Sequence, residues 1–211
     1  MASGEQSEQL AGLPDTGRVR GFVLYEEIEQ ILPAGREAVA QFDTILLKLT
    51  SNSIELMDEP RTEDSVPTER FFDSEEWEED FGESAPLRTY LKEVLKVPRL
   101  TPEEERELAK RIQEALRVAL ASGDYSAKQA VEEAEKRLIE PNLWIALGTA
   151  THFTNRGLKI LDLVQVGNIG LMRATTEYNY LRAYPFSTYA TWWVRRATIQ
   201  ALRDNELKRK H

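Results

Sequence analysis

The pattern of apolar and polar positions predicts helices along most of the chain. Near the start, apolar side chains recur at spacings of three and four residues over 22–32 and again over 36–50. A short extended segment follows the second of these predicted helices. We therefore expect a small helical N-terminal module over 18–57, preceded by a disordered polar tail over 1–17.

The rest of the chain predicts a bundle of longer helices. Thr101 opens one helix with a T-x-x-E capping box, and Ser126 offers a second capping box for the next helix. Pro141 lies inside the following apolar run and predicts a kink or a division, and Ser187 is the expected N-cap of the last helix. In the preceding helix the core candidates are Ile160, Leu161, Leu163, Val164, Ile169, Leu171 and Met172. The fold class predicted is all-α, with a helical domain over 84–211.

Composition restricts the class of protein. The 211 residues include 41% hydrophobic and 30% charged residues, which is ordinary for a globular protein, and no cysteine. No apolar run approaches the roughly 18 residues that cross a bilayer, and the N-terminus lacks a secretory signal. We expect a cytoplasmic protein that does not bind membranes.

Charge is unevenly distributed along the chain, whose net charge is −9. Residues 58–83 carry twelve carboxylates against two arginines, a net charge of −10. From Asn142 onward ten lysines and arginines face four carboxylates, a net charge of +6. The acidic block predicts a disordered linker, which could also cover a basic face and compete with DNA. Its aromatic residues leave three interpretations open: a mimic of single-stranded nucleic acid, a contact with a neighbouring surface, or no specific role.

The most distinctive stretch lies near the C-terminus, over 177–203. Seven aromatic residues fall within sixteen positions, and four arginines are interleaved with them: Tyr178, Tyr180, Tyr184, Phe186, Tyr189, Trp192 and Trp193, with Arg182, Arg195, Arg196 and Arg203. Flat π faces stack on bases and guanidinium groups neutralise phosphates, so this composition favours a surface for single-stranded nucleic acid. Packing of the aromatic residues in a core is the alternative, because aromatic side chains are usually buried.

No catalytic chemistry is indicated. His152 and His211 form no ligand cluster, and the sequence contains no phosphate-binding glycine loop and no nucleophile motif. We expect neither an enzyme nor a cofactor or metal requirement.

Two long motifs resemble a known family. TNRGLKILDLVQVGNIGLMRA, followed by YPFSTYATWWVRRA, closely resembles the second region of bacterial RNA polymerase sigma factors of the sigma-70 type. Ala85 to Ile112 resembles the family segment just upstream (region 1.2). Residues 21–59 resemble, more weakly, the N-terminal acidic module of primary sigma factors.

The resemblance implies two binding surfaces in the helical domain. One would bind the β′ coiled coil of core RNA polymerase, through Asp162, Gln165, Asn168 and Met172. The other would recognise the promoter −10 element and hold bases flipped from its non-template strand. The matching DNA-binding positions are Asn142, Tyr178, Arg182, Tyr184, Thr188, Tyr189, Trp192, Trp193, Arg195, Arg196 and Ile199. Among these, Trp192 and Trp193 resemble the pair that wedges at the upstream edge of the bubble, while Arg195, Arg196 and Ile199 match the turn that faces the last duplex base pairs.

Several positions depart from the family pattern. Basic residues are usual where this chain has Thr151, Glu177, Leu181 and Pro185, which predicts weaker DNA binding. A Glu is common at Val166 and an Arg at Trp144. Arg196 and Ile199 replace the usual Gln and Thr that read the −12 pair, which predicts an altered or relaxed promoter preference, because Arg suits guanine better than an A·T pair.

The function predicted from this resemblance is that of a sigma-type initiation factor that melts the −10 element together with core polymerase. The alternative is a truncated, sigma-like decoy or regulator that binds core polymerase without supporting initiation. The chain ends at ELKRKH, so we expect the family's later domains to be missing, in a fragment or in a naturally shortened copy. We also expect a monomer when free, in which the N-terminal module and acidic linker restrain DNA binding.

Overall fold

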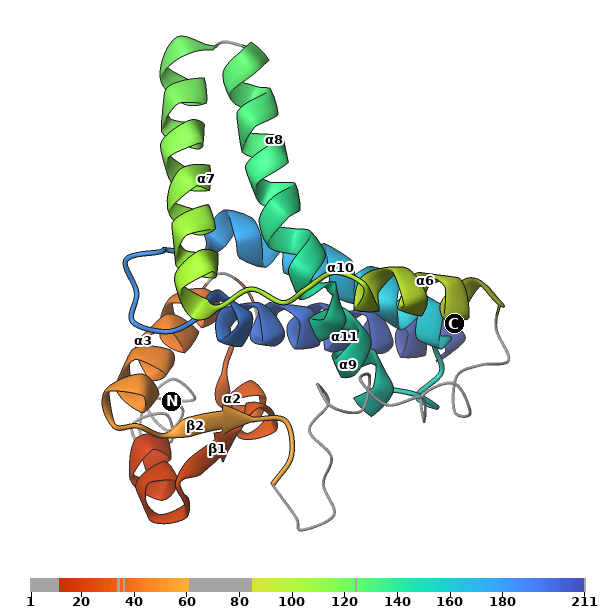
Figure 1. Cartoon of the computed structure of the whole chain (residues 1–211). Coiled ribbons are helices and arrows are strands. Elements are labelled where there is room, and N and C mark those ends of the chain that lie inside the picture. The colour runs from red at the N-terminus through yellow and green to blue at the C-terminus, as the bar shows by residue number, and fades with distance from the viewer. Residues whose placement is uncertain (1–11, 34, 36, 61–84, 124, 211) are drawn as a thin grey trace. The chain divides into compact units, whose positions relative to one another are not determined.

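The computed structural model describes residues 12–33, 35, 37–60, 85–123 and 125–210 (Figure 1). They divide into two units, one formed by residues 1–65 with 181–184 and the other by 66–180 with 185–211. Nearly all of the regular structure is helical, which confirms the predicted all-α class. None of the described helices is long and apolar enough to cross a membrane. Nearly all of the predicted acidic linker over 58–83 lies outside the described residues, so its disorder stays a prediction.

The N-terminal unit combines helices with a two-stranded parallel sheet. Its elements in order are β1 (Phe22–Leu24), α2 (Tyr25–Ile31), α3 (Glu37–Ser51) and β2 (Glu55–Met57). Val23 is paired with Leu56, and the apolar stripe of α3 is buried, with Phe42, Ile45, Leu46 and Leu49 at 3% exposure or less. The predicted helix at 36–50 and the extended segment after it are thus confirmed.

Two predictions for this unit are wrong. Local periodicity predicted a helix over 22–24, but these residues form a strand. Their backbone groups pair with those of residues 55–57, which are distant in sequence. Residues 12–20 are helical, and Leu13 is buried, so helical structure begins inside the predicted tail. Residues 1–11 lie outside the described part of the chain.

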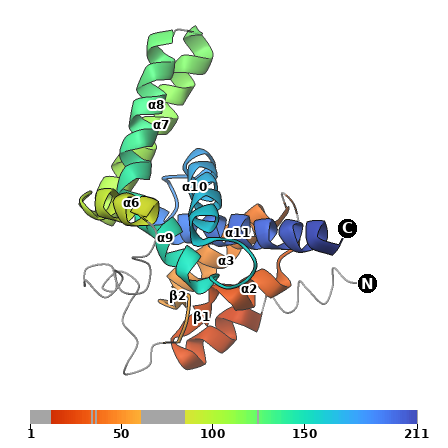
Figure 2. The same cartoon turned by 90° about the vertical axis from the view of Figure 1, so that its right-hand side faces the viewer.

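The second unit is built from six helices and one helical turn among its described residues. These are α6 (Ala85–Leu95), α7 (Pro102–Ser122), α8 (Tyr125–Ile139), the 3-10 turn η1 (Glu140–Asn142), α9 (Leu143–His152), α10 (Ile160–Glu177) and α11 (Phe186–Lys210). Within this unit, α7 and α8 form a hairpin that projects from α9, α10 and α11 in both views (Figures 1 and 2).

Local sequence signals set most of these boundaries. The Thr101 hydroxyl accepts a hydrogen bond from the Glu104 amide at 3.3 Å, and the Glu104 carboxylate accepts one from the Thr101 amide at 2.7 Å. This capping box was predicted, as was the division at Pro141, where η1 separates α8 from α9. The second predicted capping box is wrong, because α8 already begins at Tyr125, one residue before Ser126.

The core of the second unit lies where α6, α9, α10 and α11 meet. The helix α9 is buried from Ile145 to Ala150, as expected for a helix that is apolar on all sides. The side chains that surround it in one cluster are Leu87, Leu91, Phe153, Leu163, Val164 and Leu202. Ile169 and Met172 are not in this core: they are 51% and 56% exposed, so their prediction as core residues is wrong.

Two glycines bring α10 close to its neighbours. A Cβ added at Gly170 would lie 2.7 Å from the backbone oxygen of Trp193 on α11. A Cβ at Gly167 would lie 2.9 Å from the Cβ of Ala146 on α9. The two helices that carry the predicted binding surfaces are therefore held together at backbone contact distance, and their relative position is fixed.

Candidate nucleic-acid interface

The aromatic stretch folds into a chain of ring contacts at the start of α11. Tyr178 and Phe186 meet edge to face, with ring centroids 5.3 Å apart, and Tyr178 lies 5.7 Å from Tyr189. Trp193 continues the chain at 6.3 Å from Tyr189 and 5.3 Å from Trp192. Tilted and edge-on contacts of this kind are the preferred geometry of buried aromatic groups.

Most of this aromatic cluster (Tyr178, Phe186, Tyr189, Trp192 and Trp193) is buried. Four of its members are no more than 2% exposed, and Trp193 alone is half-buried. The Nε1 atom of Trp193 is buried and has no hydrogen-bond partner among the described residues. The sequence left open whether these rings stack on bases or form a core, and in this arrangement most of them form a core.

The arginines of α11 also pack against aromatic rings. The Arg195 guanidinium lies 5.3 Å from the centre of the Phe153 ring and the side chain is 6% exposed, whereas Arg196 is half-buried over Trp192 at 5.1 Å. Ile199 packs against the α6–α9–α10–α11 core. Arg195 is therefore buried against Phe153 in a cation–π contact, and its role in DNA binding stays a prediction.

Sequence reasoning missed a buried carboxylate beneath the start of α11. Glu105 of α7 is 3% exposed, and its Oε2 accepts hydrogen bonds from the Ser187 amide at 3.2 Å and from the Ser187 hydroxyl at 3.4 Å. Ser187 lies inside the first turn of α11, so Glu105 occupies the role predicted for Ser187 as the N-cap. The signal was available, because Glu105 falls on the apolar stripe of Leu108, Ala109 and Ile112.

Burial sets the electrostatics of this polar group. It raises the pKa of Glu105, while hydrogen bonds from Ser187 and from Asn142 oppose the change. Burial, with a smaller contribution from the nearby Glu105 charge, raises the pKa of Tyr178 to about 12. The predicted DNA-binding residue Asn142 is itself buried, and its side-chain amide donates to the Leu138 carbonyl at 2.9 Å.

Two predicted DNA-binding side chains belong to the N-terminal unit by their contacts. Arg182 Nη2 lies 2.5 Å from Oδ2 of Asp43 on α3, and the Tyr184 hydroxyl donates to the same carboxylate. Tyr184 is 1% exposed and Arg182 is half-buried. Asp43, which the sequence did not single out, therefore engages both of these side chains.

Three of the four residues predicted to bind polymerase share an exposed face of α10, and the exception is Asn168. Asp162, Gln165 and Met172 are exposed, and Ile169, which the sequence assigned to the core, joins them on this face. Asn168 is half-buried and exchanges hydrogen bonds with the Tyr90 hydroxyl of α6, at 3.0 and 3.3 Å. Burial raises the pKa of Tyr90, which keeps this hydroxyl protonated.

Neither surface offers a metal site among the described residues. Within the described parts of the chain, no group of three or more His, Asp or Glu side chains could hold a metal ion. What the arrangement offers is an aromatic, arginine-lined region on α11 and a mixed polar and apolar face on α10.

Comparison with known proteins matches all three parts of the chain to one family. The family models are Sigma-70 region 2 over residues 138–207, Sigma-70 factor region 1.2 over 86–116, and Sigma-70 factor region 1.1 over 4–84. The chain belongs to the sigma-70 family. It is 33% identical, over 208 residues and 95% of its length, to the RNA polymerase sigma factor SigA of Clostridium acetobutylicum. The chain covers 48% of that relative, about half its length.

The three sigma-70 regions correspond to recognisable structural parts. Region 2 contains α9, α10 and α11, and thus both predicted binding surfaces. Region 1.2 contains α6 and the first two-thirds of α7, which carries Glu105. Glu177 and Leu181, two positions at which the resemblance predicted basic residues, are exposed and therefore lie on the surface.

Proposed function

We propose that this chain acts as a sigma-type transcription initiation factor. It binds core RNA polymerase, and it recognises and melts the promoter −10 element by capturing flipped bases of the non-template strand. The match to sigma-70 region 2 and the similarity to SigA support the general role, and the geometry of α10 and α11 supports the finer assignment.

The aromatic cluster carries this proposal. Trp193 is its half-exposed member and stands edge-on to both Tyr189 and Trp192. On the same helix, Thr188 and Arg196 are also half-buried, so they reach the surface within two turns of Trp193. A base that enters here would meet an indole, a hydroxyl and a guanidinium, the groups that stack on bases and neutralise phosphates.

Base capture could also give a hydrogen-bond partner to the indole N–H of Trp193. The buried Nε1–H of Trp193 has no hydrogen-bond partner among the described residues, and an unsatisfied donor of this kind costs about 1–3 kcal/mol. A base or phosphate oxygen that accepts from this group would recover part of that cost. Such a bond requires Trp193 to turn its buried Nε1–H toward the bound strand.

The exposed face of α10 supports polymerase binding. Asp162, Gln165, Ile169 and Met172 are spaced by three, four and three residues, the pattern of one seam in a coiled coil. Such a stripe suits docking against the β′ coiled coil. Asn168 lies beside it, held by Tyr90.

Run-off transcription tests the proposal. The chain and core polymerase are combined on an extended −10 promoter, and core binding is measured in parallel. We expect transcripts from the wild type and a loss of at least tenfold for Trp193→Ala, with core binding unchanged. Tyr125→Ala, at an aromatic residue 73% exposed at the far end of the α7–α8 hairpin, is the matched control and should transcribe normally.

The decoy function is the second candidate. Glu177 and Leu181 are exposed at positions that usually hold basic residues in the family, and Arg195 is buried, so the surface has fewer cations to offer phosphates. Core binding without transcripts, from the wild type under all salt conditions, would select this function over initiation.

We also propose that the N-terminal module restrains DNA binding in the free protein. The support is Asp43, whose carboxylate engages Arg182 and Tyr184. Asp43→Asn in the full chain should raise the affinity of the free protein for −10 single strands, and deletion of residues 1–83 should raise it further. Asp15→Asn, at an exposed carboxylate that pairs with Arg18 within the helix 12–20, is the control. Unchanged affinity in both the Asp43 variant and the deletion would refute the restraint.

A further inference from the structure

The far end of the α7–α8 hairpin exposes apolar side chains that the functions above do not use. Leu116 is 39% exposed and Leu120 is 79% exposed. They are spaced by four residues, so they share one face of α7. Gln113 lies on the same face, three residues before Leu116, and its side-chain amide donates to the Tyr178 carbonyl at 2.8 Å. The side of α7 that contacts the rest of the second unit at Gln113 therefore continues as an apolar, exposed surface.

The position of the hairpin explains why this surface is uncovered. Both views show α7 and α8 projecting beyond α9, α10 and α11, so the last turns of the hairpin lie away from these helices (Figures 1 and 2). Neighbouring leucines exposed on a projecting element are typical of a contact surface for another chain.

The same part of the hairpin lies between two of the sigma-70 family models. The match to region 1.2 ends at residue 116, and the match to region 2 begins at residue 138. Residues 117–137, with Leu120, belong to neither match. A contact at this place would be a feature of this chain, separate from the two predicted surfaces on α10 and α11.

The charges near these leucines suit a second copy of the same chain. Residues 116–132 contain two cations and two carboxylates, so two copies would not repel each other through net charge. Lys128 and Glu132 are exposed and share one face of α8, again at a spacing of four. Contacts about a two-fold axis are reciprocal, so in an antiparallel pair Lys128 of each copy can face Glu132 of the other. Leu116 of each copy can face Leu120 of the other in the same way.

One two-fold axis can serve both sets of contacts. The leucine pair on α7 and the charged pair on α8 lie at nearly the same distance from the connection that joins the two helices. In a tip-to-tip arrangement the remaining helices of the second unit lie at opposite ends of the pair, so they do not obstruct it.

We propose that this chain forms a homodimer in which the hairpin tips of two copies pack antiparallel as a short four-helix bundle. Leu116 and Leu120 form its apolar contact, and Lys128 and Glu132 form its reciprocal ion pairs. Only the end of each hairpin is buried, so the interface falls below the roughly 1,200 Å² of standard specific interfaces, and the association is weak. The dimer departs from the monomer expected from the sequence, and it does not depend on the proposed function.

A helix of an unrelated protein is the competing occupant of this surface. It would cover the leucines, but it would leave the pattern of charges on α8 without a role. Burial raises the pKa of Glu135, and the charge of Glu132 raises it further, so these carboxylates repel each other. Lys128 of a second copy would bring a cation to Glu132 and offset this repulsion.

Sedimentation velocity of the full chain without polymerase tests the dimer. At low ionic strength, where exposed charges are least screened, the average mass should rise from that of one chain toward that of two as the protein concentration increases. Leu120→Glu should weaken the association at least about tenfold, because the burial of a leucine side chain is lost. Leu207→Glu, at an exposed leucine of α11, is the matched control and should associate as the wild type does.

An exchange of charges tests the reciprocal contacts. Lys128→Glu and Glu132→Lys should each weaken the association about tenfold, because each places like charges across the two-fold axis. A one-to-one mixture of these two variants should associate again, because every charged pair in the mixed dimer is of opposite sign. Circular dichroism should show the same helical content in all variants.

Three results would contradict the proposal. A wild type that stays monomeric at every concentration would overturn the dimer and leave another protein as the occupant. Equal association of Leu120→Glu and the wild type would remove the hairpin tip from the interface. A mixture of the two charge variants that associates no better than either variant alone would overturn the antiparallel, reciprocal arrangement.

Discussion

At the scale of single residues, the site depends on polar groups placed inside apolar surroundings. Glu105 lies in the buried stripe of α7 and accepts hydrogen bonds from the first turn of α11. The aromatic residues and the arginines could be singled out from the sequence by their type, and Asn142 only through the resemblance to the sigma-70 family. The apolar stripe of α7 marked Glu105 as unusual, but neither its partner Ser187 nor the role of Asp43 could be predicted, because the two partners of each contact are distant in sequence. The burial of Arg195 over Phe153 likewise depends on tertiary packing.

Glu105 should make the stability of the protein depend on pH. Its pKa is raised by burial above the ordinary value of 4.5, so the folded state binds the proton more tightly than the unfolded state. The free energy of unfolding therefore falls as the pH rises from 4.5 through the raised folded-state pKa. Glu105→Gln removes this titration. In urea unfolding, the free energy of unfolding of the variant should therefore rise relative to that of the wild type between pH 5 and pH 8.

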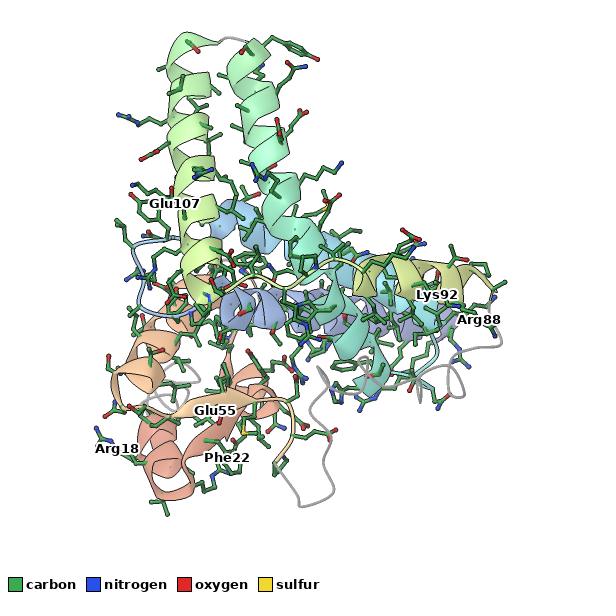
Figure 3. All side chains as sticks on the ribbon, viewed as in Figure 1. Arg18, Phe22, Glu55, Arg88, Lys92 and Glu107 are labelled. Carbon is green, nitrogen blue, oxygen red and sulfur yellow. The ribbon has the colours of Figure 1, made fainter. Side chains whose placement is uncertain are left out.

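The matched control is Glu107→Gln on the same helix (Figure 3). Glu107 pairs with Arg111 at 3.2 Å, but 54% of its side chain is exposed, so its replacement should change stability by the same small amount at both pH values. If the difference between Glu105→Gln and the wild type were equally independent of pH, Glu105 would not be titrating in a desolvated site.

Asn168 has two possible roles. It was predicted to bind polymerase, and its hydrogen bonds with Tyr90 also join α10 to α6. Tyr90→Phe and Asn168→Ala should each lower the free energy of unfolding by about 1 kcal/mol, and the double variant should cost little more than either single change. Core binding separates the two roles. We expect Tyr90→Phe to bind core polymerase normally and Asn168→Ala to bind it more weakly. Equal weakening by both would mean that Asn168 acts only by joining α6 to α10.

At the scale of secondary-structure elements, the sequence predicted most of the helices, because their periodicity and caps are local. The capping box at Thr101 and the division at Pro141 are examples. The failures have non-local causes. The segment 22–24 is a strand only because 55–57 lies beside it, and α11 is capped by a carboxylate from α7. Ile169 and Met172 have the periodicity of core residues. They are nevertheless exposed, because the neighbouring helices cover only part of the apolar face of α10.

The close packing of α10 against α11 gives a prediction for Gly170. Gly170→Ala places a methyl group 2.7 Å from the Trp193 backbone oxygen, and backbone on both sides cannot yield easily. Overpacking of this kind costs about 1–3 kcal/mol, and denaturant unfolding should show a loss in that range. Gly12→Ala, with nothing within 4 Å of the added atom, is the control and should be neutral. An equally stable Gly170→Ala would mean that α10 and α11 can separate at no cost.

At the scale of the whole molecule, charge and burial bear directly on the proposed DNA binding of this acidic protein. The net charge of −9 hides a C-terminal part from Asn142 onward with a net charge of +6. In that part most of the aromatic cluster is buried, and Arg182 is paired with Asp43. The sequence predicted these residues as a DNA-binding set, but it could not predict that they would be packed in a core and bound to a carboxylate. The chain is therefore expected to bind DNA weakly by itself and more strongly when polymerase is present.

The most direct test of this view is the affinity of the chain for single-stranded −10 DNA, with and without core polymerase. Anisotropy titrations would compare the −10 non-template strand with a scrambled strand of the same composition. We predict that the complex with core polymerase binds the −10 strand at least tenfold more tightly than the scrambled strand, and that Trp193→Ala abolishes this difference. Equal affinity of the wild-type complex for the two strands would contradict a role in −10 recognition.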